Sequence, residues 1–158
     1  MGYYTRITES DIFISKDDFV YCYERMCKLN DRDDLKTGGS WGGYNNGLSA
    51  DKPRPEGMSY HPAKWFSWLD ANYPEKCKTM ADILFELGFE DIKYDEDGNL
   101  ISLWYDNKTG DEALFLQIIS PYVKAGSYLN WQGEDGTHYQ FFFNGKEMVM
   151  KAGVISWE

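Results

Sequence analysis

Hydrophobic and polar residues alternate along residues 128 to 158, which is the pattern of β-strands with one buried face. Tyr139, Phe141 and Phe143 fall on one side of a strand, and the residues between them fall on the other. Turns at 133–136, 144–146 and 151–153 divide the stretch, and the Asp-Gly and Asn-Gly pairs of the first two favour tight hairpins. This region therefore predicts a C-terminal four-strand meander whose apolar face needs helices to cover it.

Elsewhere the apolar spacing widens to about 3.6 residues, which predicts helices. Ser15 begins one that ends near Asn30, with acidic residues at its positive end. The apolar stripe expected on this helix consists of Phe19, Val20, Tyr23, Met26 and Cys27. Further helices are expected over 62–69, from Pro74, over 80–87 with a stop at Gly88, and over 109 to about 122.

Short strands are expected at 3–7 and 11–14, and a hairpin is expected where 89–94 and 100–105 flank an acidic turn with Gly98. Strands near both ends with helices between them indicate an α+β fold. We expect an antiparallel sheet of about six to eight strands, with three or four helices packed on one face. The chain 1–158 is predicted to be a single domain with a long Gly/Pro-rich loop at about 31–61.

Composition narrows the class of protein. Of 158 residues, 42% are hydrophobic and 17% aromatic, which is typical of a folded protein and not of a disordered acidic tail. No apolar run approaches the roughly 20 residues of a membrane span, and the start of the chain has no apolar signal region. Three cysteines without a C-x-x-C pair indicate a reducing, cytoplasmic location.

The formal charge of −10 is unevenly distributed. From Asp82 to Glu112 there are ten acidic residues and two basic ones. Such a field repels nucleic acid and anionic membranes, and it attracts basic protein surfaces. The acidic residues expected to contact a partner are those of the predicted hairpin: Glu90, Asp91, Asp95, Glu96 and Asp97.

Two aromatic residues, Trp41 and Tyr44, lie among glycines in the long loop. Aromatic side chains presented between small residues resemble a binding surface, so both residues are added to the predicted partner-binding set. The alternative is that Trp41 folds back as a plug over the sheet.

No motif predicts a catalytic residue, a metal ligand or a cofactor. Neither His61 nor His138 has a His, Cys or carboxylate at a repeating metal-ligand spacing in the sequence. In a calcium-loop alignment of the acidic turn, Lys93 takes a ligand position. The glycines of the long loop form no phosphate-binding motif. The sequence leaves open a nucleophilic catalytic site formed by Cys77, His138 and a carboxylate. It also leaves open a carboxylate pair for glycoside hydrolysis.

The opening Met-Gly-Tyr-Tyr-Thr, the run Trp104-Tyr105-Asp106, the turn 133–136 and the turn 144–146 together resemble a group of small uncharacterised proteins. These are found in phages and in bacterial genomes with mobile elements, and the similarity covers roughly a third of the chain. The resemblance implies a cytoplasmic, phage-borne accessory protein, and it offers no catalytic residues that could be carried over to this sequence.

These observations favour a non-enzymatic acidic binding protein. The leading hypothesis is an inhibitor that occupies a basic surface of a host nuclease or other nucleic-acid-handling defence effector, as an anti-CRISPR protein does. One alternative is an immunity protein or antitoxin that neutralises a bacterial toxin by the same charge attraction. Another is an enzyme with an unrecognised carboxylate site. Oligomeric state and the identity of the partner stay open.

Overall fold

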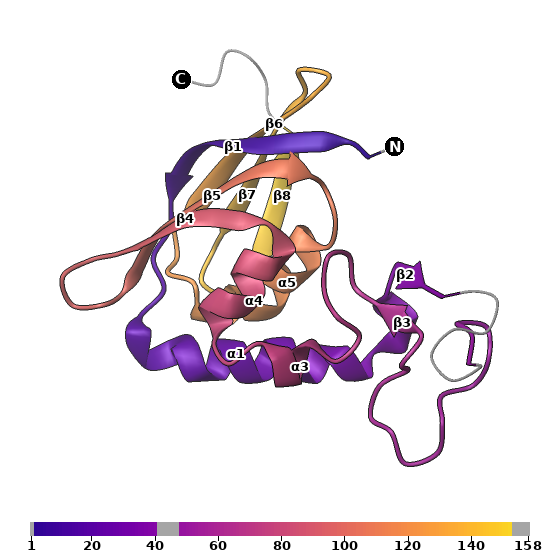
Figure 1. Cartoon of the computed structure of the whole chain (residues 1–158). Helices are drawn as coiled ribbons and strands as arrows, with labels where there is room; N and C mark the ends of the chain where they lie inside the picture. The colour runs from indigo at the N-terminus through magenta and orange to yellow at the C-terminus, as the bar shows by residue number, and fades with distance from the viewer. Residues whose placement is uncertain (1, 41–47, 153–158) are drawn as a thin grey trace.

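The computed structural model describes residues 2–40 and 48–152 (Figure 1). These residues form a six-stranded antiparallel sheet of order β4-β5-β1-β6-β7-β8 and a two-stranded sheet, β2-β3. The strands are β1 Tyr4–Asp11, β2 Gly38–Gly39, β3 Lys64–Trp65, β4 Phe89–Tyr94, β5 Leu100–Lys108, β6 Tyr128–Gly133, β7 His138–Phe143 and β8 Met148–Ala152. The α-helices are α1 Phe19–Lys28, α3 Tyr73–Lys76, α4 Met80–Leu87 and α5 Glu112–Ile119. Short 3-10 turns cover Lys16–Asp18, Leu29–Asp31, Asp33–Leu35 and Ser120–Tyr122. The predicted α+β class is confirmed.

One face of the six-stranded sheet forms the core. Phe141 and Phe143 of β7 and Leu129 and Trp131 of β6 are buried, as the alternation in the sequence predicts. Helices α1, α4 and α5 lie along this side of the sheet (Figure 1), and their buried residues belong to the same apolar cluster. The meander consists of β6, β7 and β8, and the predicted fourth strand falls in 153–158, outside the described residues.

The N-terminal strand lies in the middle of the sheet, antiparallel to both β5 and β6. The prediction of two short strands was wrong, because β1 is one strand that a bulge bends. Ile7 faces Trp131 and Glu9 faces Asn130, so Thr8 is the extra residue of the bulge. The second segment contributes only Ile14, which forms single bridges outside the strands.

The helix expected after Ser15 is confirmed, and the Ser15 hydroxyl accepts a hydrogen bond from the backbone N–H of Asp17 (3.2 Å). Its apolar stripe was predicted wrongly in part. Cys22 and Met26, one turn apart, are fully buried against the core, whereas Val20 is 53% exposed. The helix packs against α4 and α5, and Cys22 and Met26 belong to the apolar cluster that this packing forms.

The helix expected over 62–69 was wrong, since Lys64 and Trp65 form strand β3, paired with Gly38 and Gly39. A Cβ on Gly38 would lie 2.2 Å from Trp65 Nε1, so the indole occupies space that only glycine leaves free. Phe66 is nevertheless buried. The burial expected for the apolar residues of this segment is confirmed for Phe66 and Leu69 and was wrong for Trp68, which is 49% exposed. The helix was predicted wrongly because the strand that pairs with β3 lies far away in sequence.

The segment from α4 to β5 follows its sequence signals closely. The Thr79 hydroxyl caps α4 by accepting the backbone N–H of Asp82 (3.1 Å), and Gly88 ends the helix with φ of 115°. The edge strand β4 begins directly afterwards and pairs with β5. Helix α4 therefore lies beside β4, which is an edge strand of the sheet (Figure 1).

Candidate partner-binding surface

The β4–β5 hairpin carries the five acidic residues predicted to bind a partner, and one of them shapes the turn. Asp95 Oδ1 accepts the backbone N–H groups of Asp97 (3.0 Å) and Asn99 (2.9 Å), and Asp95 Oδ2 accepts Asn99 Nδ2 (3.1 Å). The hydrogen bonds from Asn99 lower the pKa of Asp95, because they stabilise its charged form. Gly98 supplies the positive φ that the turn requires. The Asp95 carboxylate is therefore engaged within the turn.

The other four side chains, Glu90, Asp91, Glu96 and Asp97, are exposed. None of them forms an ion pair with any residue that the structure describes. The register between β4 and β5 shifts on both sides of Lys93, and Asp91 has a positive φ of 49°. An irregular, charged edge of this kind disfavours the addition of another strand. The hairpin thus presents carboxylates, and not backbone groups, to a partner.

Two further acidic residues, Asp17 and Asp18, join the hairpin through the fold. The backbone N–H of Lys16 donates to Asn99 Oδ1 (2.9 Å), a contact between residues 83 apart in the chain. The acidic residues at the start of α1, on α4, on β4 and in the β4–β5 turn together form the acidic edge. They are Asp17, Asp18, Asp82, Glu86, Glu90, Asp91, Asp95, Glu96 and Asp97. The sequence alone predicts Asp17 and Asp18 only as residues at the start of a helix, because no local signal links them to the hairpin.

A groove of about 420 Å³ lies within the acidic edge, between the starts of α1 and α4 and the end of β4. The residues that line it are Phe19, Val20, Tyr23, Lys78, Thr79, Met80, Ala81 and Tyr94. Burial raises the pKa of the Tyr94 hydroxyl, and the negative charge of Asp82 raises it further. Asp82 is therefore close enough to act electrostatically on the wall of the groove.

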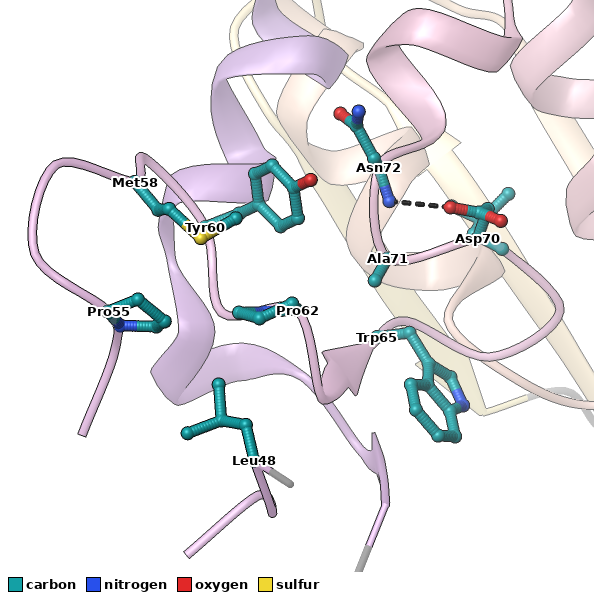
Figure 2. A pocket seen from close by; sticks show the side chains of 10 residues that line it. Leu48, Pro55, Met58, Tyr60, Pro62, Trp65, Asp70, Ala71 and Asn72 are labelled. Atoms are coloured by element: carbon teal, nitrogen blue, oxygen red, sulfur yellow. Dashed lines mark hydrogen bonds between the residues drawn. The ribbon is translucent and has the colours of Figure 1, made fainter. Parts of the chain in front are cut away.

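A larger cavity of about 840 Å³ lies among the loops that precede α3 (Figure 2). Pro55, Met58, Tyr60 and Trp65 contribute much of its apolar lining. Asp70 is the one carboxylate in the described lining, and it accepts the backbone N–H of Asn72 (2.8 Å). The cavity consequently holds no carboxylate pair of the kind that glycoside hydrolysis uses.

Trp41 and Tyr44 lie outside the described residues. Their assignment to the partner-binding surface stays a prediction, and so does the alternative in which Trp41 plugs the sheet.

The first part of the long loop is anchored by Asp33. Its Oδ1 accepts Lys36 Nζ (2.8 Å) and the backbone N–H of His61 (3.1 Å), and its Oδ2 accepts the Arg54 guanidinium (2.6 Å). Burial raises the pKa of Asp33, but the hydrogen bonds from Lys36 and Arg54 outweigh this effect, so the pKa is lowered. All three ion pairs among residues 2–40 and 48–152 involve Asp33 or its neighbour Asp34. Asp33, the partly buried acid of this region, therefore serves structure.

Cys77 and His138, the two residues of the possible nucleophilic catalytic site, lie apart in the structure. Cys77 is buried beside the helices, and burial raises the pKa of its thiol to about 11, so it is protonated near neutral pH. His138 pairs with Gln132, and it precedes Tyr139, whose ring stacks on the buried Trp131. Because successive strand residues alternate, His138 faces the side of the sheet away from the core. Cys77 and His138 consequently lie on opposite sides of the sheet.

The buried carboxylate of Glu112 also has a structural role. It accepts the backbone N–H of Gly110 (2.6 Å), the hydroxyl of Thr109 and the hydroxyl of Tyr105 (3.5 Å). These donors satisfy the acid at the start of α5. No cluster of three or more metal-ligating side chains occurs in the described part of the chain.

No protein-family model matches the chain, and no curated protein and no solved structure is significantly similar to it. Among the described residues, no helix is both long enough and apolar enough to cross a membrane.

Proposed function

We propose that this protein is a non-enzymatic, cytoplasmic binding protein. Its acidic edge occupies a basic surface of a nucleic-acid-handling protein and inhibits it, as a phage-borne inhibitor of a host defence effector would. The observation that carries the proposal is the concentration of acidic side chains on contiguous elements at one edge of the sheet. Glu90, Glu96 and Asp97 among them are exposed and lack an ion pair within the described ranges.

The inhibition rests on charge mimicry. Carboxylates held on a rigid hairpin take the place of phosphates on the basic surface of the partner. The hairpin is ordered before binding, because Asp95 fixes its turn and Asn99 ties that turn to the start of α1. Pre-ordering lowers the entropy cost of association. Complementary fields also speed association and make it sensitive to salt, while the same field repels free nucleic acid.

The test compares three proteins as bait in a bacterial lysate. One is the wild type, and the second carries Glu90→Gln, Glu96→Gln and Asp97→Asn. The third, a matched control, loses the same charge elsewhere through Glu56→Gln, Asp106→Asn and Glu147→Gln, all at exposed positions. We expect the wild type and the control to retain a nucleic-acid-binding protein at low salt, and added duplex DNA to displace it.

The hairpin variant should retain much less of that protein. Retention that is equal for all three baits, or that DNA does not affect, would count against charge mimicry. Activity of the retained protein, measured with and without the wild type, then decides whether binding inhibits it.

A further inference from the structure

The groove within the acidic edge leaves apolar surface in contact with solvent. Val20 is 53% exposed on one wall and Tyr94 is 44% exposed on another. Phe85 is 66% exposed, and it lies one helical turn beyond Ala81 on the same face of α4. Exposed apolar side chains that adjoin a groove mark an interaction site more often than singly scattered ones do.

The interior of the groove offers few hydrogen-bonding groups. The hydroxyl of Tyr23 donates to the carbonyl oxygen of Cys77 (2.6 Å), and the hydroxyl of Thr79 accepts the backbone N–H of Asp82 (3.1 Å). Lys78 lines the groove, but its ammonium donates to the carbonyl oxygen of Glu75 (3.0 Å). Met80 forms a buried apolar part of the lining. A group that enters the groove must therefore be apolar.

The groove has walls from α1, α4 and β4, and its rim is acidic at the α4 wall. Asp82 directly follows Ala81 there, and its negative charge adds to burial in raising the pKa of the Tyr94 hydroxyl on the β4 wall. The edge-to-face contact of Phe19 with Tyr94, with ring centroids 6.1 Å apart, holds two of these walls together. A segment whose apolar side chain fills the groove would thus lie close to Asp82 and within the negative field of the acidic edge.

We infer that the groove binds a short basic segment of a protein partner, in which one bulky apolar side chain lies between lysines or arginines. The apolar side chain fills the groove, and the flanking cations face the acidic rim. The inference rests on the proposed function for the sign of the partner's charge, and on the groove for the apolar anchor. It adds a specific contact to an attraction that charge alone would leave weakly selective.

The probes are three five-residue peptides with capped ends: Lys-Lys-Phe-Lys-Lys, the same peptide with Ser in place of Phe, and Glu-Glu-Phe-Glu-Glu. Each is titrated into the full-length, isotope-labelled protein, and affinity is taken from NMR shift changes. Burial of one aromatic side chain makes the basic Phe peptide about tenfold tighter than the Ser peptide. The largest shifts should occur at Phe19, Val20, Ala81 and Tyr94.

Two variants locate the effect. Val20→Gln should bring the Phe-to-Ser affinity ratio close to one, whereas Val149→Gln, at an exposed valine on the opposite edge strand, should leave it unchanged. Because both valines are exposed, both variants should keep the dispersed spectrum of the wild type.

Each result separates the groove from the charge. Equal affinity for the Phe and Ser peptides, or an unchanged ratio in Val20→Gln, overturns the groove as the anchor site and leaves the acidic edge untouched. Equal affinity for the Lys and Glu peptides overturns the charge basis of the proposed function and leaves the groove untouched.

Discussion

Asp33→Asn should destabilise the fold strongly, although Asp33 lies in a region that the sequence predicts to be an irregular loop. The side chain of Lys36 is 0% exposed, and its ammonium depends on Asp33 and on the carbonyl oxygen of Asn30 (2.9 Å). Removing the aspartate charge leaves a buried cation without its counter-ion. Breaking a buried pair by removing one partner costs about 3–5 kcal/mol. We expect about 3 kcal/mol, the lower end of this range, because Arg54 is 34% exposed and asparagine still offers an acceptor.

The loss should extend beyond the loop. The Lys36 ammonium lies 5.7 Å from the centroid of the Phe66 ring, and Phe66 packs edge-to-face on Phe115 of α5 with centroids 5.2 Å apart. Urea unfolding followed by tryptophan fluorescence measures the free energy of unfolding directly.

The neighbouring Asp34→Asn is the matched control. Asp34 pairs with Arg32 at the surface, where the two side chains are 63% and 59% exposed, so its loss should leave the free energy of unfolding unchanged within experimental error. Adding Lys36→Met to Asp33→Asn should restore part of the stability, because the unpaired buried charge is then removed. A loss in Asp33→Asn no larger than that in Asp34→Asn would refute the assignment of Asp33 as the anchor.

The remaining predictions concern the pH dependence of Asp33, the helix stop at Gly88 and the reactivity of the cysteines. Because the hydrogen bonds from Lys36 and Arg54 outweigh burial, the pKa of Asp33 lies below its ordinary value of 3.8. The stability that ionised Asp33 contributes is complete above that value and is lost as the pH falls through the folded-state pKa. Acid titration should therefore destabilise the wild type more steeply than Asp33→Asn, and parallel curves of stability against pH would contradict this. Gly88→Ala should lower the stability of the fold by more than about 1 kcal/mol, since φ is 115° and the new Cβ would lie 2.8 Å from Tyr105. Gly136→Ala, at φ of 87° in open space, should lower it less. Thermal unfolding of both variants tests this order. Burial raises the pKa of Cys22 to about 12 and that of Cys77 to about 11. Iodoacetamide near neutral pH should therefore modify Cys27, which is only partly buried, first in the folded protein. Mass spectrometry that finds Cys22 labelled earliest would be inconsistent with the packing.

Local signals in the sequence were sufficient for part of the fold. The cap at Thr79, the stop at Gly88 and the acidic turn with Gly98 act within a few residues, so α4 and the β4–β5 hairpin follow directly from them. Alternation from 139 to 143 likewise identified the core face of β7.

Contacts between distant residues account for the rest. β1 enters the middle of the sheet because Ile7 pairs with Trp131, and nothing in the first ten residues encodes that position. The strand β3 pairs with a distant segment, in which Gly38 leaves room for the indole of Trp65. The same limit applies to the candidate site, since the fold alone brings Asp17 and Asp18 to the hairpin and turns Asp95 inward to its own turn.

The central claim is that the acidic edge acts through its charge. Its most direct test is the affinity of the wild type and of the variant with Glu90→Gln, Glu96→Gln and Asp97→Asn for the captured partner, measured from about 0.05 M to about 0.5 M salt. We predict that the wild-type affinity falls steeply with salt, while the variant binds weakly and with a much shallower dependence. A wild-type affinity that salt does not change, or that the three substitutions do not reduce, would contradict the claim.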